Sequence, residues 1–205
     1  MKTTYLKMLA GALAVVTVVG CNNASERKDE TQANQTMQPA EHAAPPASTE
    51  SQPDTIRKSI PSETAGKIGE ANLKINYHSP GVKGRVIWGG LVPYDQVWVT
   101  GAHRATTLET DKNLTIGGKK LGAGKYALFT IPGKENWTVI INKNWEQHLA
   151  DDYAQQEDVV RVQVTPQTLQ SPQERLKYDI KGGPGNTGTI DISWADLLVS
   201  VPVKS

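Results

Sequence analysis

Beyond residue 58, hydrophobic and polar residues alternate along much of the chain. From residue 73 to residue 78, Leu, Ile and Tyr alternate with Lys, Asn and His. Later segments repeat the alternation, with apolar residues at 160, 162 and 164, at 176, 178 and 180, at 190, 192 and 194, and at 199, 201 and 203. A period of two places such side chains on one face of a β-strand. The pattern therefore predicts strands that each bury one face.

Turn-forming residues separate these segments. Clusters rich in glycine or proline occur at residues 79–81, 89–90, 117–118, 132–133 and 182–185. Short strands divided by turns at regular spacing are typical of antiparallel sandwiches. We therefore expect residues 59–205 to form a single all-β domain, an antiparallel β-sandwich-like fold. A helical turn or two is expected only between Asn144 and Gln156.

The N-terminal segment has a different pattern. Two lysines precede an apolar stretch from Met8 to Val19, which is shorter than the roughly 18 residues that a membrane-spanning helix requires. The sequence Val-Val-Gly-Cys that ends at Cys21 resembles the lipobox of bacterial lipoproteins, in which the cysteine is acylated and the peptide is cut just before it. We therefore expect residues 1–20 to be a lipoprotein signal peptide and Cys21 to carry the lipid, palmitate included. A plain cleavable signal with an incidental cysteine is the alternative.

Residues 21–58 are expected to be the lipidated cysteine and a disordered linker. The segment is rich in Ser, Thr, Gln, Ala and Pro and has almost no large apolar residue. It cannot bury enough surface to offset the entropy that ordering would remove. Asn22 stands where an Asp would retain many lipoproteins in the inner membrane. We therefore expect a protein anchored in the outer membrane by its lipid, facing the periplasm or the cell surface.

The charges of the chain are balanced. The 205 residues include 22 Lys and Arg against 21 Asp and Glu, for a net charge of +1 at pH 7. No net field attracts nucleic acid, so no nucleic-acid partner is expected. The single cysteine excludes an internal disulfide framework and a cysteine-based metal cluster.

Catalytic and metal-binding motifs are missing from the sequence. It has no Gly-x-Ser-x-Gly elbow and no His-x-x-x-His pair. The run IGGKKLGAGK lacks the Gly-Lys-Ser/Thr ending of a phosphate-binding loop, and two hairpin turns explain it better. No catalytic residue, metal site or cofactor is therefore predicted. His78 lies on the polar face of its strand and is expected to be exposed.

Some residues in the loops are candidates for ligand contact. Trp137 and Trp194 alternate in phase with apolar strand residues and are expected in the core. Trp88 and Trp145 instead border Gly-rich or polar loops. The remaining polar candidates are His103, Arg104, His148 and Asp152. A solvated role is the simpler interpretation of each of these polar residues.

Two classes of function stay open. The favoured one is a non-catalytic cell-envelope lipoprotein whose β domain binds an unidentified small-molecule ligand or partner protein through its loops. The alternative is a small-molecule enzyme or a metal-binding protein that uses His103, Arg104, His148 and Asp152. A metal site needs about three converging ligands, so the separation of the histidines distinguishes the two.

Three stretches resemble one bacterial family. The chain resembles the family called domain of unknown function 2911 over residues 59–203, in the stretch SPGVKGRVIWGGLVPYDQVWVTGAHRATTLETDKNLTIGGKKLGAGKYALFTIPGKENWTVIINKN and later in DDYAQQEDVVRVQV and SWADLLVSVPV. The resemblance implies a secreted or lipid-anchored β-rich domain and supplies no reaction. After the tryptophan matched by Trp98, the family usually has Arg-Thr-Gly-Ala-Asn-Glu-Ala-Thr. This chain instead places Val99, His103 and Arg104 at three of those positions, so a polar site built there would be lost or remade.

Overall fold

The computed structural model describes Asp54 and residues 58–205; the predicted signal peptide, Cys21 and nearly all of the predicted linker lie outside the described residues. The described residues form ten β-strands and one short 3₁₀ helix, η1 (Gln155–Glu157). This helix begins at the end of the segment in which a helical turn was expected. No helix in the described part is long and apolar enough to cross a membrane. The fold is all-β, as the alternation predicted.

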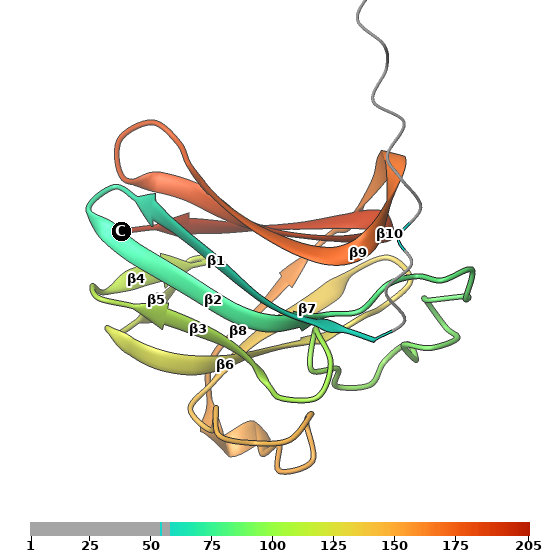
Figure 1. The fold of residues 1–205 in the computed structure, drawn as a ribbon. Helices are drawn as coiled ribbons and strands as arrows, with labels where there is room; N and C mark the ends of the chain where they lie inside the picture. Colours follow the sequence, from blue (N-terminus) through green and yellow to red (C-terminus); the bar gives the residue numbers. More distant parts are fainter. Residues whose placement is uncertain (1–53, 55–57) are drawn as a thin grey trace, which may run out of the picture. The chain divides into compact units, whose positions relative to one another are not determined.

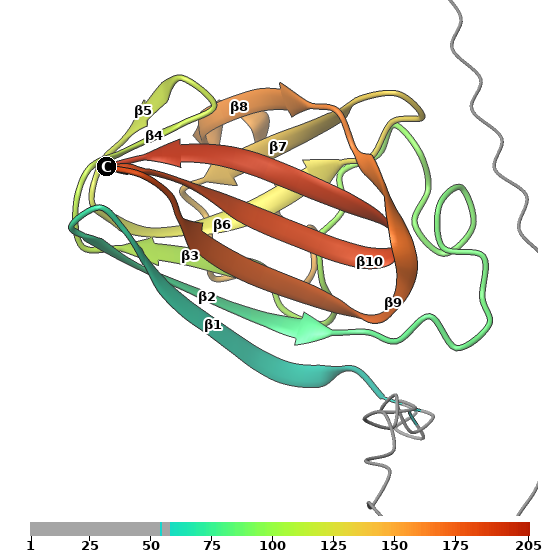
Figure 2. The same ribbon diagram turned by 90° about the horizontal axis from the view of Figure 1, so that it is seen from above.

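The strands form two antiparallel sheets that lie face to face (Figure 1). The six-stranded sheet contains, in spatial order, β1 (Ile60–Ile68), β2 (Ala71–Ser79), β3 (Thr106–Thr110), β6 (Gly124–Ile131), β7 (Trp137–Asn142) and β8 (Asp158–Val164). The four-stranded sheet contains, in spatial order, β5 (Lys119–Leu121), β4 (Leu114–Ile116), β10 (Thr187–Lys204) and β9 (Gln167–Gly182). Figure 2 shows the long strands β9 and β10 lying across the six-stranded sheet. The predicted β-sandwich is confirmed.

The main core lies between the two sheets. Leu73, Ile75 and Tyr77 of β2 are buried while the residues between them are more exposed, as the period of two predicted. Trp137 in β7 and Trp194 in β10 are 1% and 2% exposed, so both are core residues, as predicted. Removing such apolar surface from water is the main term that stabilises a fold of this kind.

The apolar alternations at 190–194 and at 199–203 belong to one strand. The pairing of β10 with β9 shifts register between Ser193 and Ala195 and again between Ala195 and Leu197. Ala195 has a positive φ of 50°, which is consistent with a bulge at this position. The bulge changes the phase of the strand, because an extra residue reverses which side chains face the core. The buried residues therefore change from even to odd numbers along a single strand.

The run IGGKKLGAGK contains one hairpin turn and one crossover. Gly117 and Gly118 join β4 to β5 with φ values of 53° and 84°, a conformation that glycine adopts at little steric cost. Residues 122–123 lead from β5 in the four-stranded sheet to β6 in the six-stranded sheet. The first predicted hairpin is confirmed. The second was wrong, because β5 and β6 do not pair.

A second, smaller core covers the outer face of the six-stranded sheet. Its buried members are Val99, Ala105, Ala127, Phe129 and Ile140. The loop of residues 143–154 packs Trp145, Ala150 and Tyr153 against it. In Figure 1 the chain between β7 and β8 lies on the side of the six-stranded sheet away from β9 and β10. This loop places several of the predicted site residues over the sheet.

Candidate functional site

Two loops on the outer face of the six-stranded sheet carry most of the predicted site residues. His103 and Arg104 lie in the segment that leads into β3, and Trp145, His148 and Asp152 lie in the 143–154 loop. Arg104 and His148 form an isolated antiparallel bridge between the two segments. The structure therefore brings these five residues into one region, although the sequence separates the two segments by about forty residues.

Backbone hydrogen bonds hold the two loops side by side. The N–H of Leu149 donates to the carbonyl oxygen of His103 at 2.7 Å. The N–H of Ala105 donates to the carbonyl oxygen of Gln147 at 3.1 Å. Such bonds depend on no particular side chain, so the sequence pattern gave no sign of this pairing.

The 143–154 loop is also fixed from within. The buried amide of Asn142 donates to the carbonyl oxygen of Ala154 at 3.0 Å and to Oδ1 of Asp158 at 2.8 Å, and its own Oδ1 accepts the N–H of Asn144 at 2.9 Å. Oε1 of Gln147 accepts the N–H of Asp152 at 3.2 Å. The loop is thus tied to the end of β7 and the start of β8.

Trp88 lies apart from the other predicted residues. Its ring packs edge to face against Trp137, Trp98 and Trp194, with centroids 4.8, 5.9 and 5.8 Å away. Its Nε1–H donates to Oδ1 of Asp196 at 3.0 Å. Trp88 therefore belongs to a tryptophan cluster that borders the main core.

A pocket opens on the outer face of the six-stranded sheet, beside the paired loops. We call it the outer pocket; its cavity volume is about 250 Å³. Its polar lining comes from β1, β2, β3 and β6 and from the two loops, and includes Ser62, Asn76, His78, Arg104, Thr107, Lys125, Trp145, Glu146 and Gln147. Two permanent positive charges, from Arg104 and Lys125, face one negative charge, from Glu146. The pocket therefore favours an anion.

Thr107 places a hydroxyl without a partner in this lining. The residue is 7% exposed, and its Oγ1 has no hydrogen-bond partner among the described residues. The neighbouring Thr106 is also buried, but its Oγ1 donates to the carbonyl oxygen of Thr100 at 3.0 Å. A buried polar group without a partner costs about 1–3 kcal/mol. The Thr107 hydroxyl is therefore a local cost to stability among the described residues.

Lys125 and Trp145 form a cation–π pair in the wall of the outer pocket. Nζ of Lys125 lies over the indole ring, 3.9 Å from the centroid. The ring is partly buried against the second core. One face of Trp145 is thus occupied by the ammonium group, so the indole orients this charge in the pocket wall.

His78 lies at the edge of the same pocket and is more buried than its place in the strand predicted. Its pKa is lowered because burial disfavours the charged ring, and because His103 and Arg104 add positive charge nearby. The imidazole is therefore held toward its neutral form, in which it can accept as well as donate a hydrogen bond.

The other candidates do not converge as a metal or catalytic site would require. Nδ1 of His148 and Oδ2 of Asp151 are 2.8 Å apart, and both side chains are more than half exposed. Within Asp54 and residues 58–205, no group of three His, Cys, Asp or Glu side chains is arranged to hold a metal ion. Asp152 is exposed, and its backbone rather than its side chain joins the loop network.

The three positions at which this chain departs from the usual family pattern lie in different structural environments. Val99, where the pattern has Arg, is 3% exposed and belongs to the second core. His103 is exposed and has a φ of 63°, a region in which Asn and His are enriched among residues other than glycine. Arg104 lines the outer pocket. The three positions therefore do not meet at one site in this chain: Val99 is in the second core, and His103 and Arg104 are exposed.

Sequence reasoning missed Asn76, Thr107 and Lys125 as members of the site. All three lie on outward faces of β2, β3 and β6, where a polar residue is expected in any half-buried strand. A usable signal was present in β6 and β7. Ala127, Leu128 and Phe129, and likewise residues 139–141, are buried in succession, which indicates a sheet covered on both faces.

The comparisons with known proteins identify the family. The family model described as "Protein of unknown function (DUF2911)" matches residues 59–203, most of the chain. No curated protein and no solved structure matches the chain. The chain belongs to the DUF2911 family, as the resemblance of its motifs indicated, and its domain is a β-sandwich.

Proposed function

We propose that this protein is a lipid-anchored lipoprotein of the outer membrane, and that its β domain binds a small organic anion in the outer pocket without transforming it. The anchor rests on Cys21 and the lipobox-like sequence before it. The ligand rests on the pocket itself. A domain held on a polar linker near a membrane is suited to capturing a soluble molecule.

The two cations of the lining, Arg104 and Lys125, are the observation that carries the ligand proposal. A carboxylate or phosphate accepts strong charge-assisted hydrogen bonds from such cations. One anion would therefore offset the excess positive charge of the outer pocket.

The volume of the outer pocket limits the size of the ligand. Its volume of about 250 Å³ lies just below the roughly 300–1,000 Å³ of pockets for drug-sized molecules. A small metabolite such as a sugar acid fits this range better than a polymer does. Asn76 and Gln147 supply amide groups for the hydroxyls of such a molecule.

Binding fits the arrangement of the loops better than catalysis does. A catalytic pair needs a nucleophile and a base within hydrogen-bond reach. In the described part of the chain, His148 is bonded to the exposed Asp151, and no serine, threonine or cysteine donates to either residue. This supports the non-catalytic class over an enzyme or a metal-binding protein.

Titration followed by backbone NMR tests the proposal. The full chain carrying Cys21→Ser is titrated with glucuronate, citrate and inorganic phosphate, and with glucose as the neutral control. We expect saturable shifts at the amides of residues 104, 107 and 125 for at least one anion and none for glucose. Arg104→Gln should weaken binding about tenfold or more, whereas Lys119→Gln, on the exposed side of β5, should leave it unchanged. Equal shifts with glucose, or no saturable shift with any of the three anions, would refute it.

A further inference from the structure

A second cavity lies beside the long connection from β2 to β3. We call it the tryptophan pocket; its volume is about 740 Å³. Trp98 and Trp194 line it, together with Leu91, Leu149 and Val92. None of the residues that line the outer pocket belongs to this lining, so the two cavities are distinct sites.

Two stacked indole rings form part of the wall of the tryptophan pocket. Trp98 and Trp194 are stacked, with ring centroids 5.6 Å apart and planes inclined by 19°. Trp194 is 2% exposed, and its Nε1–H has no hydrogen-bond partner among the described residues. Buried indole N–H groups usually find an acceptor. The contribution of this wall to ligand binding is its aromatic surface, which an apolar group can contact.

The mouth of the pocket is apolar and exposed. Leu91 and Leu149 lie on two different loops, and their side chains are 47% and 36% exposed. They are two of the three large hydrophobic residues that are exposed in the described part of the chain. Exposed apolar side chains that gather at one cavity mark a binding surface.

Positive charge rims the same mouth. Lys58 and Arg85 line the pocket, and its lining contains no Asp or Glu. An apolar cavity with a cationic rim is complementary to a molecule with an apolar body and an acidic head. The charge thus distinguishes this site from a general hydrophobic patch.

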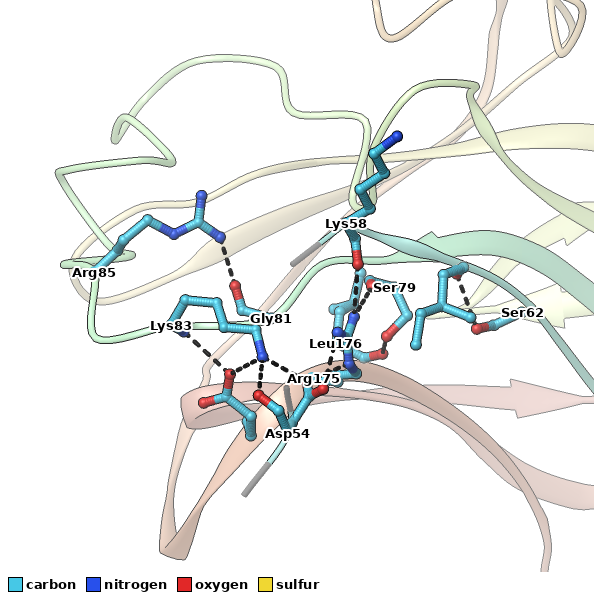
Figure 3. A network of polar contacts seen from close by, with 11 residues as sticks. Asp54, Lys58, Ser62, Ser79, Gly81, Lys83, Arg85, Arg175 and Leu176 are labelled. Carbon is cyan, nitrogen blue, oxygen red and sulfur yellow. Dashed lines mark hydrogen bonds and ion pairs between the residues drawn. The ribbon is translucent and has the colours of Figure 1, made fainter. Parts of the chain in front are cut away.

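A network of polar contacts fixes the backbone of this rim (Figure 3). The carboxylate of Asp54 forms an ion pair with Nζ of Lys83, at 3.0 Å, and a second ion pair with the guanidinium group of Arg175. Nη1 of Arg175 donates to the carbonyl oxygen of Lys58 at 3.2 Å. In Figure 3 the ammonium end of Lys58 extends away from this network. The network therefore positions the Lys58 backbone and leaves its ammonium group outside the network.

Arg85 is held on the other side of the rim. Its Nη2 donates to the carbonyl oxygen of Gly81 at 2.5 Å, and its Nε donates to the carbonyl oxygen of Val82 at 3.1 Å. These neutral acceptors leave the positive charge of Arg85 without a carboxylate partner among the described residues. Arg85 is thus preorganised for an anion, which lowers the entropic cost of binding one.

We propose that the tryptophan pocket binds a free amphiphilic carboxylic acid, such as a medium-chain fatty acid. The apolar chain packs against Trp98, Leu91 and Leu149, and the carboxylate lies at the rim with Lys58 and Arg85. The volume of about 740 Å³ is within the range of small-molecule sites. An anionic membrane lipid carries the same two chemical groups, and the experiment separates the two sources.

Tryptophan fluorescence provides the main measurement. The full chain carrying Cys21→Ser is titrated with dodecanoate, and with dodecanol and dodecyltrimethylammonium as neutral and cationic analogues. We expect a saturable change with dodecanoate and markedly weaker binding of both analogues. Arg85→Gln and Lys58→Gln should each weaken dodecanoate binding by about tenfold. Leu91→Ser should weaken the binding of all three ligands, because the substitution removes apolar contact and leaves the charges unchanged.

Matched controls and a vesicle arm make the outcome decisive. Lys119→Gln, exposed on β5, should not change dodecanoate binding. Equal affinity for dodecanoate and dodecanol would overturn the proposal. Charge-dependent sedimentation with phosphatidylglycerol vesicles, without binding of monomeric dodecanoate, would also overturn it and assign the pocket to membrane lipid. Because the two pockets share no lining residue, each proposal can fail without the other.

Discussion

The imidazole rings of His78 and His103 meet edge to face, with centroids 5.2 Å apart and planes inclined by 80°. His78 lines the outer pocket and His103 lines the tryptophan pocket. One ring of the pair thus belongs to each cavity. Charge on His103 is one of the causes that lower the pKa of His78, after burial of the His78 ring.

The first prediction concerns the pH dependence of stability. The pKa of His78 is lowered in the folded protein, first by burial and then by His103 and Arg104. Above about pH 6.5 the ring is neutral in both the folded and the unfolded chain. As the pH falls below that value, the unfolded chain binds the proton first, so the free energy of unfolding decreases until the folded pKa is passed. We expect His78→Gln to reduce this decrease.

Urea unfolding at pH 7.5, 6.5 and 5.5 measures this effect. The parent chain should lose more stability between pH 6.5 and pH 5.5 than the His78→Gln variant does. Identical slopes in the two proteins would show that His78 is protonated as readily in the folded chain as in the unfolded one.

A second prediction tests the unpartnered hydroxyl. Thr107→Val removes a buried polar group that has no partner in the described protein and keeps the shape of the side chain. We expect the free energy of unfolding to rise by about 1 kcal/mol. Thr106→Val is the matched control. It removes a hydroxyl that donates to Thr100, so it should lower stability by about 1–2 kcal/mol. A loss of stability in both variants would mean that Thr107 has a partner in solution.

The third prediction tests the face that β8 presents to the core. Val162 is 8% exposed and its neighbour Gln163 is exposed. Val162→Asp would bury an unpaired carboxylate and should cost about 3 kcal/mol or more. Gln163→Asp adds the same charge on the outward side and should cost less than about 1 kcal/mol. Chemical denaturation of both variants measures the difference. Similar losses would mean that the strand has another register.

The alternation of apolar and polar residues made the core-facing side of β8 predictable. It could not predict where the loops lie in the fold. Alternation along a strand reflects local geometry, so the buried positions of β2 and β8 follow directly from the sequence. The bulge at Ala195 is a local change in backbone conformation that the residue types at this position do not predict. It explains why one strand presented two phases, and why the sequence alone suggested two elements.

For the candidate site residues, too, the sequence predicted the local character but not the contacts between distant segments. Their polar character in Gly-rich or irregular segments marked them as candidates, and five of the six lie together. Trp88 does not, because its position is set by packing on Trp137, whose strand is about fifty residues away in the sequence. The pairing of residues 103–105 with residues 147–149 uses backbone groups, which every residue carries. Sequence patterns therefore select the candidates, and only long-range contacts decide which of them meet.

The fourth prediction concerns the support of the 143–154 loop. Asn142 is fully buried and bonds Asn144, Ala154 and Asp158. Asn142→Ala would leave these groups without their partner and should lower the free energy of unfolding by about 2 kcal/mol. It should also speed amide hydrogen exchange in residues 143–154 more than elsewhere. Asn136→Ala, at an exposed position, is the control. Unchanged exchange in the loop would show that Asn142 does not hold it.

The last prediction returns to Cys21, which lies outside the described residues. The apolar stretch before it is too short to span a membrane, a glycine precedes the cysteine directly, and a polar linker follows. If the thiol is acylated, Cys21→Ser removes every acyl chain. At about 0.8 kcal/mol for each buried methylene, the acyl chains account for nearly all of the membrane affinity, which a polar linker cannot replace.

We expect the serine variant to accumulate as uncleaved precursor or as soluble protein, while its β domain stays folded. Fractionation with radiolabelled palmitate measures this directly. Retention of both the label and the membrane fraction in the variant would show that the cysteine is incidental, and the outer-membrane location proposed for the domain would no longer be supported.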